Sequence, residues 1–173
     1  MQKFTVGFSK SKKKFAIGSW LIRLYQWTKF SHTYIRRKSD IYTSDIMMHA
    51  SEGLVQHMSG VQFDKKHEVV AEFDIEISDE KWKQLRALMH YYSGDNYSIM
   101  QNVGIMLVDF MRLFDVRIKN PWHKGWNCSE FVMTVLQQIY PAEFSSYDPN
   151  TVTPKEVYRI LLELESQGRV SRR

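Results

Sequence analysis

The order of the expected elements constrains the fold of this chain more than any other feature of its sequence. Segments rich in β-branched and aromatic residues fall in its first half, at residues 3–8, 32–36, 46–50, 54–58 and 68–77. The apolar spacing predicts one helix over 17–27, and further helices over 79–92, 98–114, 128–140 and from 154 onward. Strands grouped in this way, with helices grouped around them, predict an α+β fold with an antiparallel sheet.

Two of the expected helices carry clear start signals. Asn127 is a good N-cap and Glu130 stands three residues later, which is the spacing of a capping box. Thr153 and Glu156 repeat that spacing, with Pro154 at the first helical position. The starts of the helices that follow Asn127 and Thr153 are therefore well defined by the sequence.

The chain's one cysteine, Cys128, falls in the first turn of the helix that begins after Asn127. A helix N-terminus presents free backbone N–H groups and the positive end of the helix dipole, which favour the thiolate over the thiol. We therefore expect the pKa of Cys128 to be lowered. Cys128 also begins an apolar stripe typical of a buried, inert thiol, and this interpretation stays open; the stripe continues with Phe131, Val132, Val135, Leu136 and Ile139.

Two of the six histidines, His32 and His49, have informative local contexts. His32 opens one strand, His49 lies in the next, and the polar segment 36–40 between them suits a hairpin, so both histidines can lie on one side of antiparallel neighbours. A cysteine hydrolase needs a nucleophile, a base and a group that orients the base, and Cys128, His32 and His49 supply these in that order. The alternative is that both are strand-edge histidines satisfied by backbone or water.

Three short segments resemble a known family. Ser31-His32-Thr33-Tyr34-Ile35 and Met48-His49-Ala50-Ser51, with Gly53 following, resemble the base and third-residue strands of NlpC-type cell-wall peptidases, which are papain-like cysteine hydrolases. Cys128-Ser129 and its apolar helix resemble their nucleophile helix. The cysteine follows both histidines here, which is the order of the circularly permuted, YiiX-like branch of that superfamily. The resemblance extends over about residues 16–165.

The resemblance implies a papain-like fold in permuted order, with the sheet that carries the histidines packed against the nucleophile helix. It implies that Cys128 is the nucleophile, His32 the general base and His49 the orienting residue. Tyr97 and Trp126 are candidate substrate-binding aromatics, and a plain helix-start role is the alternative for Tyr97. Two departures concern the substrate pocket. Glu130 replaces the small residue common after the cysteine-serine pair, and Thr33-Tyr34 replaces small or aliphatic residues.

Composition sets the remaining bounds. A chain of 173 residues is long enough for one core, so we expect a single domain over 1–173. One cysteine excludes an internal disulfide, and lysines at 10 and 12–14 interrupt any signal-peptide core, so we expect synthesis for the cytoplasm. If the chain is phage-encoded, it could be virion-associated or released by lysis. The longest apolar stretch, 103–114, is interrupted by Asp109 and Arg112, so no transmembrane segment is expected.

The formal net charge of +5 gathers in segments 10–14 and 36–38 and in the last five residues. Such clusters are usually solvated ends and turns. They could also attract nucleic acid or anionic lipid, although no nucleic-acid module accompanies them.

The sequence thus predicts a cysteine hydrolase that cleaves an amide through an acyl-enzyme, without a cofactor or metal. Its substrate would be a peptide, a muropeptide or another acyl-amide. A lipid-directed acyltransferase or thioesterase on the same fold is one alternative. Two others are a non-catalytic binding protein and a zinc site made by Cys128, His32, His49 and His123.

Overall fold

One antiparallel sheet organises the molecule. The computed structural model describes residues 1–13, 16–39, 43–51, 53–112, 114–119, 121 and 125–173. Within them, six strands pair in the order β4-β3-β2-β1-β5-β6. The strands are β1 (Gln2–Ser11), β2 (His32–Arg37), β3 (Ile46–Ser51), β4 (Leu54–Ser59), β5 (His67–Ile77) and β6 (Ser171–Arg172). The first strand of the chain therefore lies inside the sheet, between β2 and β5.

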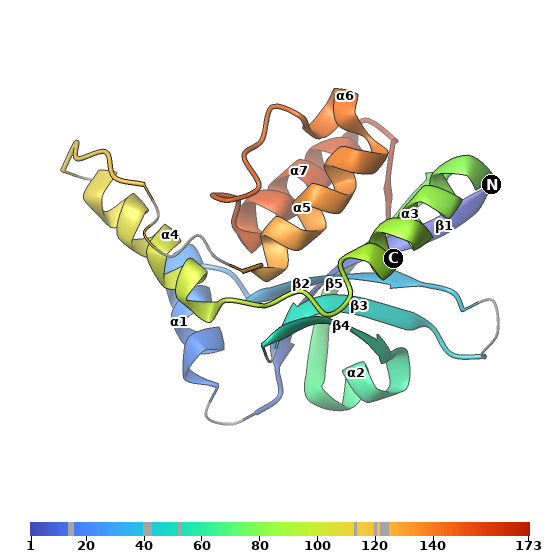
Figure 1. The fold of residues 1–173 in the computed structure, drawn as a ribbon, viewed down its shortest axis with the longest axis horizontal. Helices are drawn as coiled ribbons and strands as arrows, with labels where there is room; N and C mark the ends of the chain where they lie inside the picture. Colours follow the sequence, from blue (N-terminus) through green and yellow to red (C-terminus); the bar gives the residue numbers. More distant parts are fainter. Residues whose placement is uncertain (14–15, 40–42, 52, 113, 120, 122–124) are drawn as a thin grey trace.

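Helices cover the two faces of this sheet unequally. Figure 1 shows α3, α5, α6 and α7 on one face and the short α2 on the other, with α1 and α4 together at one end. Their bounds are α1 (Ile17–Gln26), α2 (Gly60–Lys66), α3 (Asp79–Tyr91), α4 (Ile99–Arg112), α5 (Cys128–Ile139), α6 (Pro141–Phe144) and α7 (Pro154–Ser166). We call the two sides the α5 face and the α2 face.

Alternation along the strands decides which residues reach each face. Phe4, Val6 and Phe8 of β1 belong to the large apolar core that also contains the buried side of α5. Gly7 lies on the other face, where a Cβ atom would come within 2.1 Å of the ring of Tyr34. The ring of Tyr34 therefore crosses β1 at its one residue without a side chain.

The predicted α+β class and the antiparallel sheet are confirmed. The capping boxes of α5 and α7 are both present, with Asn127 and Thr153 each accepting a hydrogen bond from the backbone N–H three residues on. The sequence analysis did not predict α2, α6 or β6. Among the described residues, no helix combines the length and apolar character needed to cross a membrane.

Candidate functional site

His32 and His49 meet as the spacing of the two strands predicted. The Nε2 atom of His32 lies 3.0 Å from Nδ1 of His49, and the hydroxyl of Ser51 lies 3.1 Å from the same Nδ1. Both rings are buried, at 8% and 1% exposure. They face α2, because Tyr34 and Met47 lie two residues from them along β2 and β3, share their face of the sheet and pack on Phe63 of that helix.

A third histidine completes a cluster of rings on the α2 face. His67 stacks on His32 with ring centroids 5.3 Å apart and on Phe63 at 4.4 Å, and its Nδ1 lies 3.4 Å from the Ser9 hydroxyl. His67 is the first residue of β5, directly after α2. The place of His67 in the cluster was not predicted, because the sequence pattern does not predict α2, the helix that turns the chain back toward His32.

Burial sets the protonation state of His32. Its pKa lies well below the ordinary 6.5, first because burial penalises the charged ring and then because His49 and His67 repel a third positive charge. His32 is therefore neutral at neutral pH. A neutral imidazole can accept a proton, which is the property that a general base needs.

Cys128 opens α5 as predicted, but its thiol is not activated. It is 2% exposed, and burial raises its pKa to about 11. The backbone N–H groups of Thr33, Ser129 and Cys128 donate toward the sulfur and lower the pKa in part. The expectation of a lowered pKa is wrong for this conformation, because desolvation outweighs the helix N-terminus.

The structure brings the sulfur next to the histidine pair without joining it to either ring. The N–H group that donates to Cys128 belongs to Thr33, the residue after His32. Thr33 alternates with Tyr34 along β2 and so belongs to the α5 face, whereas the ring of His32 lies with the cluster on the α2 face. No hydrogen bond links Cys128 to His32 or His49 among those described. Of the two links in the expected relay, the one between the histidines is present.

The backbone ladder between β2 and β3 does not extend as far as the histidine pair. Pairing between β2 and β3 begins only at Ile35 and Met48 and continues toward Arg37 and Ile46. Between His32 and Ile35 the two strands are therefore joined by the histidine pair rather than by a backbone ladder. Two polar atoms in residues flanking the sulfur, Oγ1 of Thr33 and Nδ2 of Asn127, are buried and have no hydrogen-bond partner.

The Glu130 side chain is held by hydrogen bonds at the start of α5. Its carboxylate accepts hydrogen bonds from Nε2 of Gln101 at 2.8 Å and from the backbone N–H of Asn127 at 3.2 Å. Burial raises the pKa of Glu130 to about 7. The Glu130 carboxylate thus connects α5 to α4.

Tyr97, in the connection between α3 and α4, lies beside Trp126, in the connection before Cys128. They form an isolated parallel bridge, and the indole N–H of Trp126 donates to the carboxylate of Asp95 at 2.9 Å. The Trp126 ring packs on Tyr92 with centroids 5.0 Å apart. These contacts hold the chain where it enters α5, and the substrate-binding role of both residues stays a prediction.

The zinc alternative finds no support in the described residues, where no three histidine, cysteine, aspartate or glutamate side chains are arranged to hold a metal ion. His123, the fourth ligand of that alternative, lies outside the described residues.

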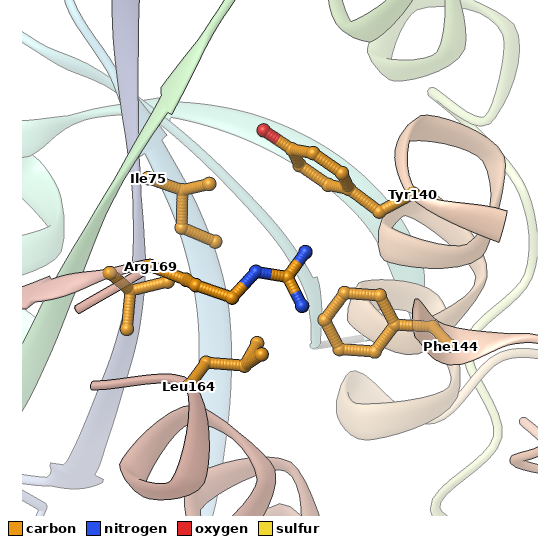
Figure 2. Close-up of a pocket in the computed structure, with 6 residues that line it drawn as sticks. Ile75, Tyr140, Phe144, Leu164 and Arg169 are labelled. Carbon is orange, nitrogen blue, oxygen red and sulfur yellow. The ribbon is translucent and has the colours of Figure 1, made fainter. Parts of the chain in front are cut away.

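A separate hollow of about 220 Å³ lies between β5, the end of α5, α6 and the segment after α7. Figure 2 shows the residues that line it. The guanidinium of Arg169 lies between the rings of Tyr140 and Phe144 and forms an ion pair with Glu143. None of the predicted site residues lines it; the lining residues are Ile75, Tyr140, Phe144, Leu164, Arg169 and Val170.

Comparison with known proteins adds no family to this picture. No protein-family model matches the chain, and no curated protein matches it.

Proposed function

We propose that the protein is a papain-like thiol hydrolase of the permuted NlpC type, with Cys128 as nucleophile, His32 as general base and His49 as the orienting residue. The observation that carries the proposal is the position of the sulfur at the start of α5. It contacts the backbone of Thr33, directly beside a histidine that is hydrogen-bonded at 3.0 Å to a second histidine. Nucleophile, base and orienting group thus come from the adjacent elements α5, β2 and β3, with the sulfur on the α5 face of the sheet and the two rings on the α2 face.

The protonation states define the mechanism. A thiol with a raised pKa and a neutral His32 do not form a resting ion pair, so the proton must leave the sulfur as the sulfur attacks. For this, the Nε2–H group of His32 donates to His49 Nδ1, which leaves the lone pair on the other ring nitrogen. Attack also requires Cys128 and the ring of His32, which lie on opposite faces of the sheet, to come into contact.

The acyl transfer then follows from the groups present. The sulfur bonds to the carbonyl carbon, and backbone N–H groups at the start of α5 stabilise the oxyanion. The buried Nδ2 of Asn127 is a further donor that lacks an acceptor. The C–N bond breaks as the imidazolium returns its proton to the leaving amine. Water, deprotonated by His32, then hydrolyses the thioester.

The substrate in this proposal is an amide, in a peptide, a muropeptide or another acyl-amide. The same three residues could serve a lipid-directed acyltransferase or thioesterase, since both begin with the same attack. The deep burial of Cys128 and its raised pKa favour a second candidate, a non-catalytic protein that keeps this fold.

Alkylation separates the two candidates before any substrate is known. Native protein is treated with iodoacetamide over a range of pH, and the labelled fraction of Cys128 is measured by mass spectrometry. A catalytic thiol reacts in the folded state, and its reactivity near neutral pH falls in His32→Gln and less in His49→Gln. His90→Gln, at an exposed histidine on α3, is the control. A thiol that reacts only after unfolding would refute the hydrolase.

Turnover assays then choose the substrate. Muropeptides, peptide amides and acyl-glycerols are each incubated with the wild type and with Cys128→Ala. Release of an amine that depends on Cys128 supports the amidase, whereas acyl transfer from a glycerol ester would support the lipid-directed enzyme.

A further inference from the structure

A stripe of basic residues runs along one side of α3. Lys83, Arg86 and His90 follow one another at helical spacing, with Ala87 between them, so that they share a face of the helix. The opposite side of α3 is buried in the core through Trp82, Leu85 and Met89. The helix is therefore anchored by one face and presents a line of positive charge on another.

This stripe forms one wall of a hollow of about 460 Å³. His57 of β4 and Arg37 at the end of β2 face it from the sheet. Among the residues that the structure describes, no carboxylate lines this hollow; its lining residues are Arg37, His57, Lys83, Arg86, Ala87 and His90. Two arginines and a lysine are its permanently charged side chains.

The position of His57 is fixed within this wall. Its Nε2 lies 3.2 Å from the backbone carbonyl oxygen of Met89, so Nε2–H donates and Nδ1 is the remaining nitrogen. Its pKa is lowered, first by burial and then by repulsion from Arg37 and His90, although the Met89 carbonyl opposes the shift. Arg37 and His90 thus disfavour a charge on His57, and a bound anion would oppose that effect.

The hollow of Figure 2 provides an internal contrast. Its single cation, Arg169, forms an ion pair with Glu143 and lies between aromatic rings. Lys83 and His90, in contrast, form no ion pair with any carboxylate that the structure describes. Glu143 thus pairs with the cation at one hollow, whereas Lys83 and His90 at the other have no such carboxylate partner among the described residues.

We propose that the hollow between α3, β2 and β4 binds a small soluble molecule carrying two or more phosphate groups. Its volume lies within the range of small-molecule sites, and is larger than a bare phosphate requires. Arginine forks and a lysine are the side chains suited to phosphate oxygens. This site is separate from the proposed catalytic residues and does not depend on them.

Isothermal titration of the full chain with sodium pyrophosphate, at fixed ionic strength, tests the proposal. Lys83→Gln and Arg86→Gln should each weaken binding by about tenfold or more, since each removes a charge-assisted contact. Lys65→Gln on α2 and Arg159→Gln on α7 change the net charge equally at exposed positions and should weaken it by less than about twofold. Equal weakening in the controls, or no binding by the wild type, would overturn the site.

Histidine resonances locate the ligand independently. Pyrophosphate should raise the pKa of His57, measured by proton NMR, because a bound anion replaces repulsion by Arg37, Lys83, Arg86 and His90 with attraction. A shift confined to other histidines would place the anion elsewhere and refute the proposal. Binding only to vesicles that contain a polyphosphorylated lipid would also refute it. Cys128→Ala should bind pyrophosphate like the wild type, whatever the outcome for catalysis.

Discussion

The two faces of the sheet are stabilised by different kinds of interaction. The α5 face is a continuous apolar core that runs from Phe4 to Val170 and takes in the buried side of α5. The α2 face has an apolar cluster of only three fully buried residues, Tyr34, Met47 and Phe63, next to histidine rings and ion pairs. One face is held mainly by burial of apolar area, and the other by hydrogen bonds and charge.

This difference bears on the candidate site. The thiol of Cys128 belongs to the apolar side, where desolvation keeps it protonated, while the two histidines belong to the polar side. The proposed chemistry must therefore operate across the sheet, at the level where β2 and β3 are not paired. Variants on each face can test whether the contrast is real.

The largest effect is expected for Phe131→Ala on the α5 face. Phe131 is fully buried in α5, and its loss should lower the free energy of unfolding by about 3–5 kcal/mol. Urea unfolding followed by circular dichroism measures this loss. Phe110→Ala removes a ring that is 55% exposed and should change the midpoint little. Equal losses for the two variants would break the description of the α5 face as the main core.

Gly7→Ala tests the α2 face through the close approach of Tyr34. The new methyl group would overlap the ring, whose nearest carbon is 2.1 Å from the Cβ position, and should cost about 2–3 kcal/mol. Thermal unfolding measures the cost. Ala71→Ser on β5 is the control. Gly168→Ala would not serve, because the positive φ of Gly168 would itself strain an alanine. An unchanged stability would mean that Tyr34 does not lie over β1.

Glu72→Gln tests the charge network of the α2 face. Glu72 accepts a hydrogen bond from the Tyr34 hydroxyl at 2.8 Å and pairs with Nε of Arg36 at 2.9 Å, and both charged side chains are largely buried. Removing its charge leaves Arg36 with the weaker partners Asp45 and Asp64, and should cost about 1–3 kcal/mol. Glu76→Gln, at a side chain 61% exposed, is the control and should be nearly neutral.

The smallest expected effect is a pH dependence of stability that comes from one titrating group on each face. The folded pKa of His32 is depressed, so its contribution to stability is complete above 6.5 and is lost as the pH falls below that value. The folded pKa of Glu130 is raised to about 7, so its contribution is complete below the ordinary 4.5 and is lost as the pH rises through 7. The two changes therefore oppose each other below neutral pH. As the pH falls below about 6.5, the loss at His32 lowers the melting temperature, whereas the gain at Glu130 between about 7 and 4.5 raises it.

Single variants separate the two contributions. In His32→Asn the melting temperature should rise as the pH falls from 7 to 4.5, because only the Glu130 contribution remains, and in Glu130→Gln it should fall more steeply than in the wild type. The opposite pattern would mean that the assignment of the two titrations to the two faces is wrong.

Local signals predicted what depends on local structure. The alternation of β-branched and aromatic residues located β2, β3, β4 and β5, and the capping boxes at Asn127 and Thr153 located two helix starts within a residue. The contact between His32 and His49 followed from their strand positions. Each of these depends on residues close together in the sequence.

What the sequence could not predict depends on tertiary contacts. The helix α2 has seven residues, begins at a glycine and is fixed by the burial of Phe63, so its own apolar pattern is weak. His67 joins the histidine cluster only because α2 turns the chain back. The pKa of Cys128 was misjudged because the depth of burial, which a helix position alone does not reveal, decides its sign.

The inner position of β1 has a consequence for how the chain acquires its structure. Gln2 pairs with Ile77, and Phe4 with both Arg37 and Ile75, so the strand made first needs partners up to 75 positions later. Such distant pairings raise the contact order and slow folding. On the ribosome, β2 can pair with one edge of β1 early, but the other edge stays unpaired until β5 emerges, which leaves Gln2–Ser11 open to chaperones and to aggregation in that interval.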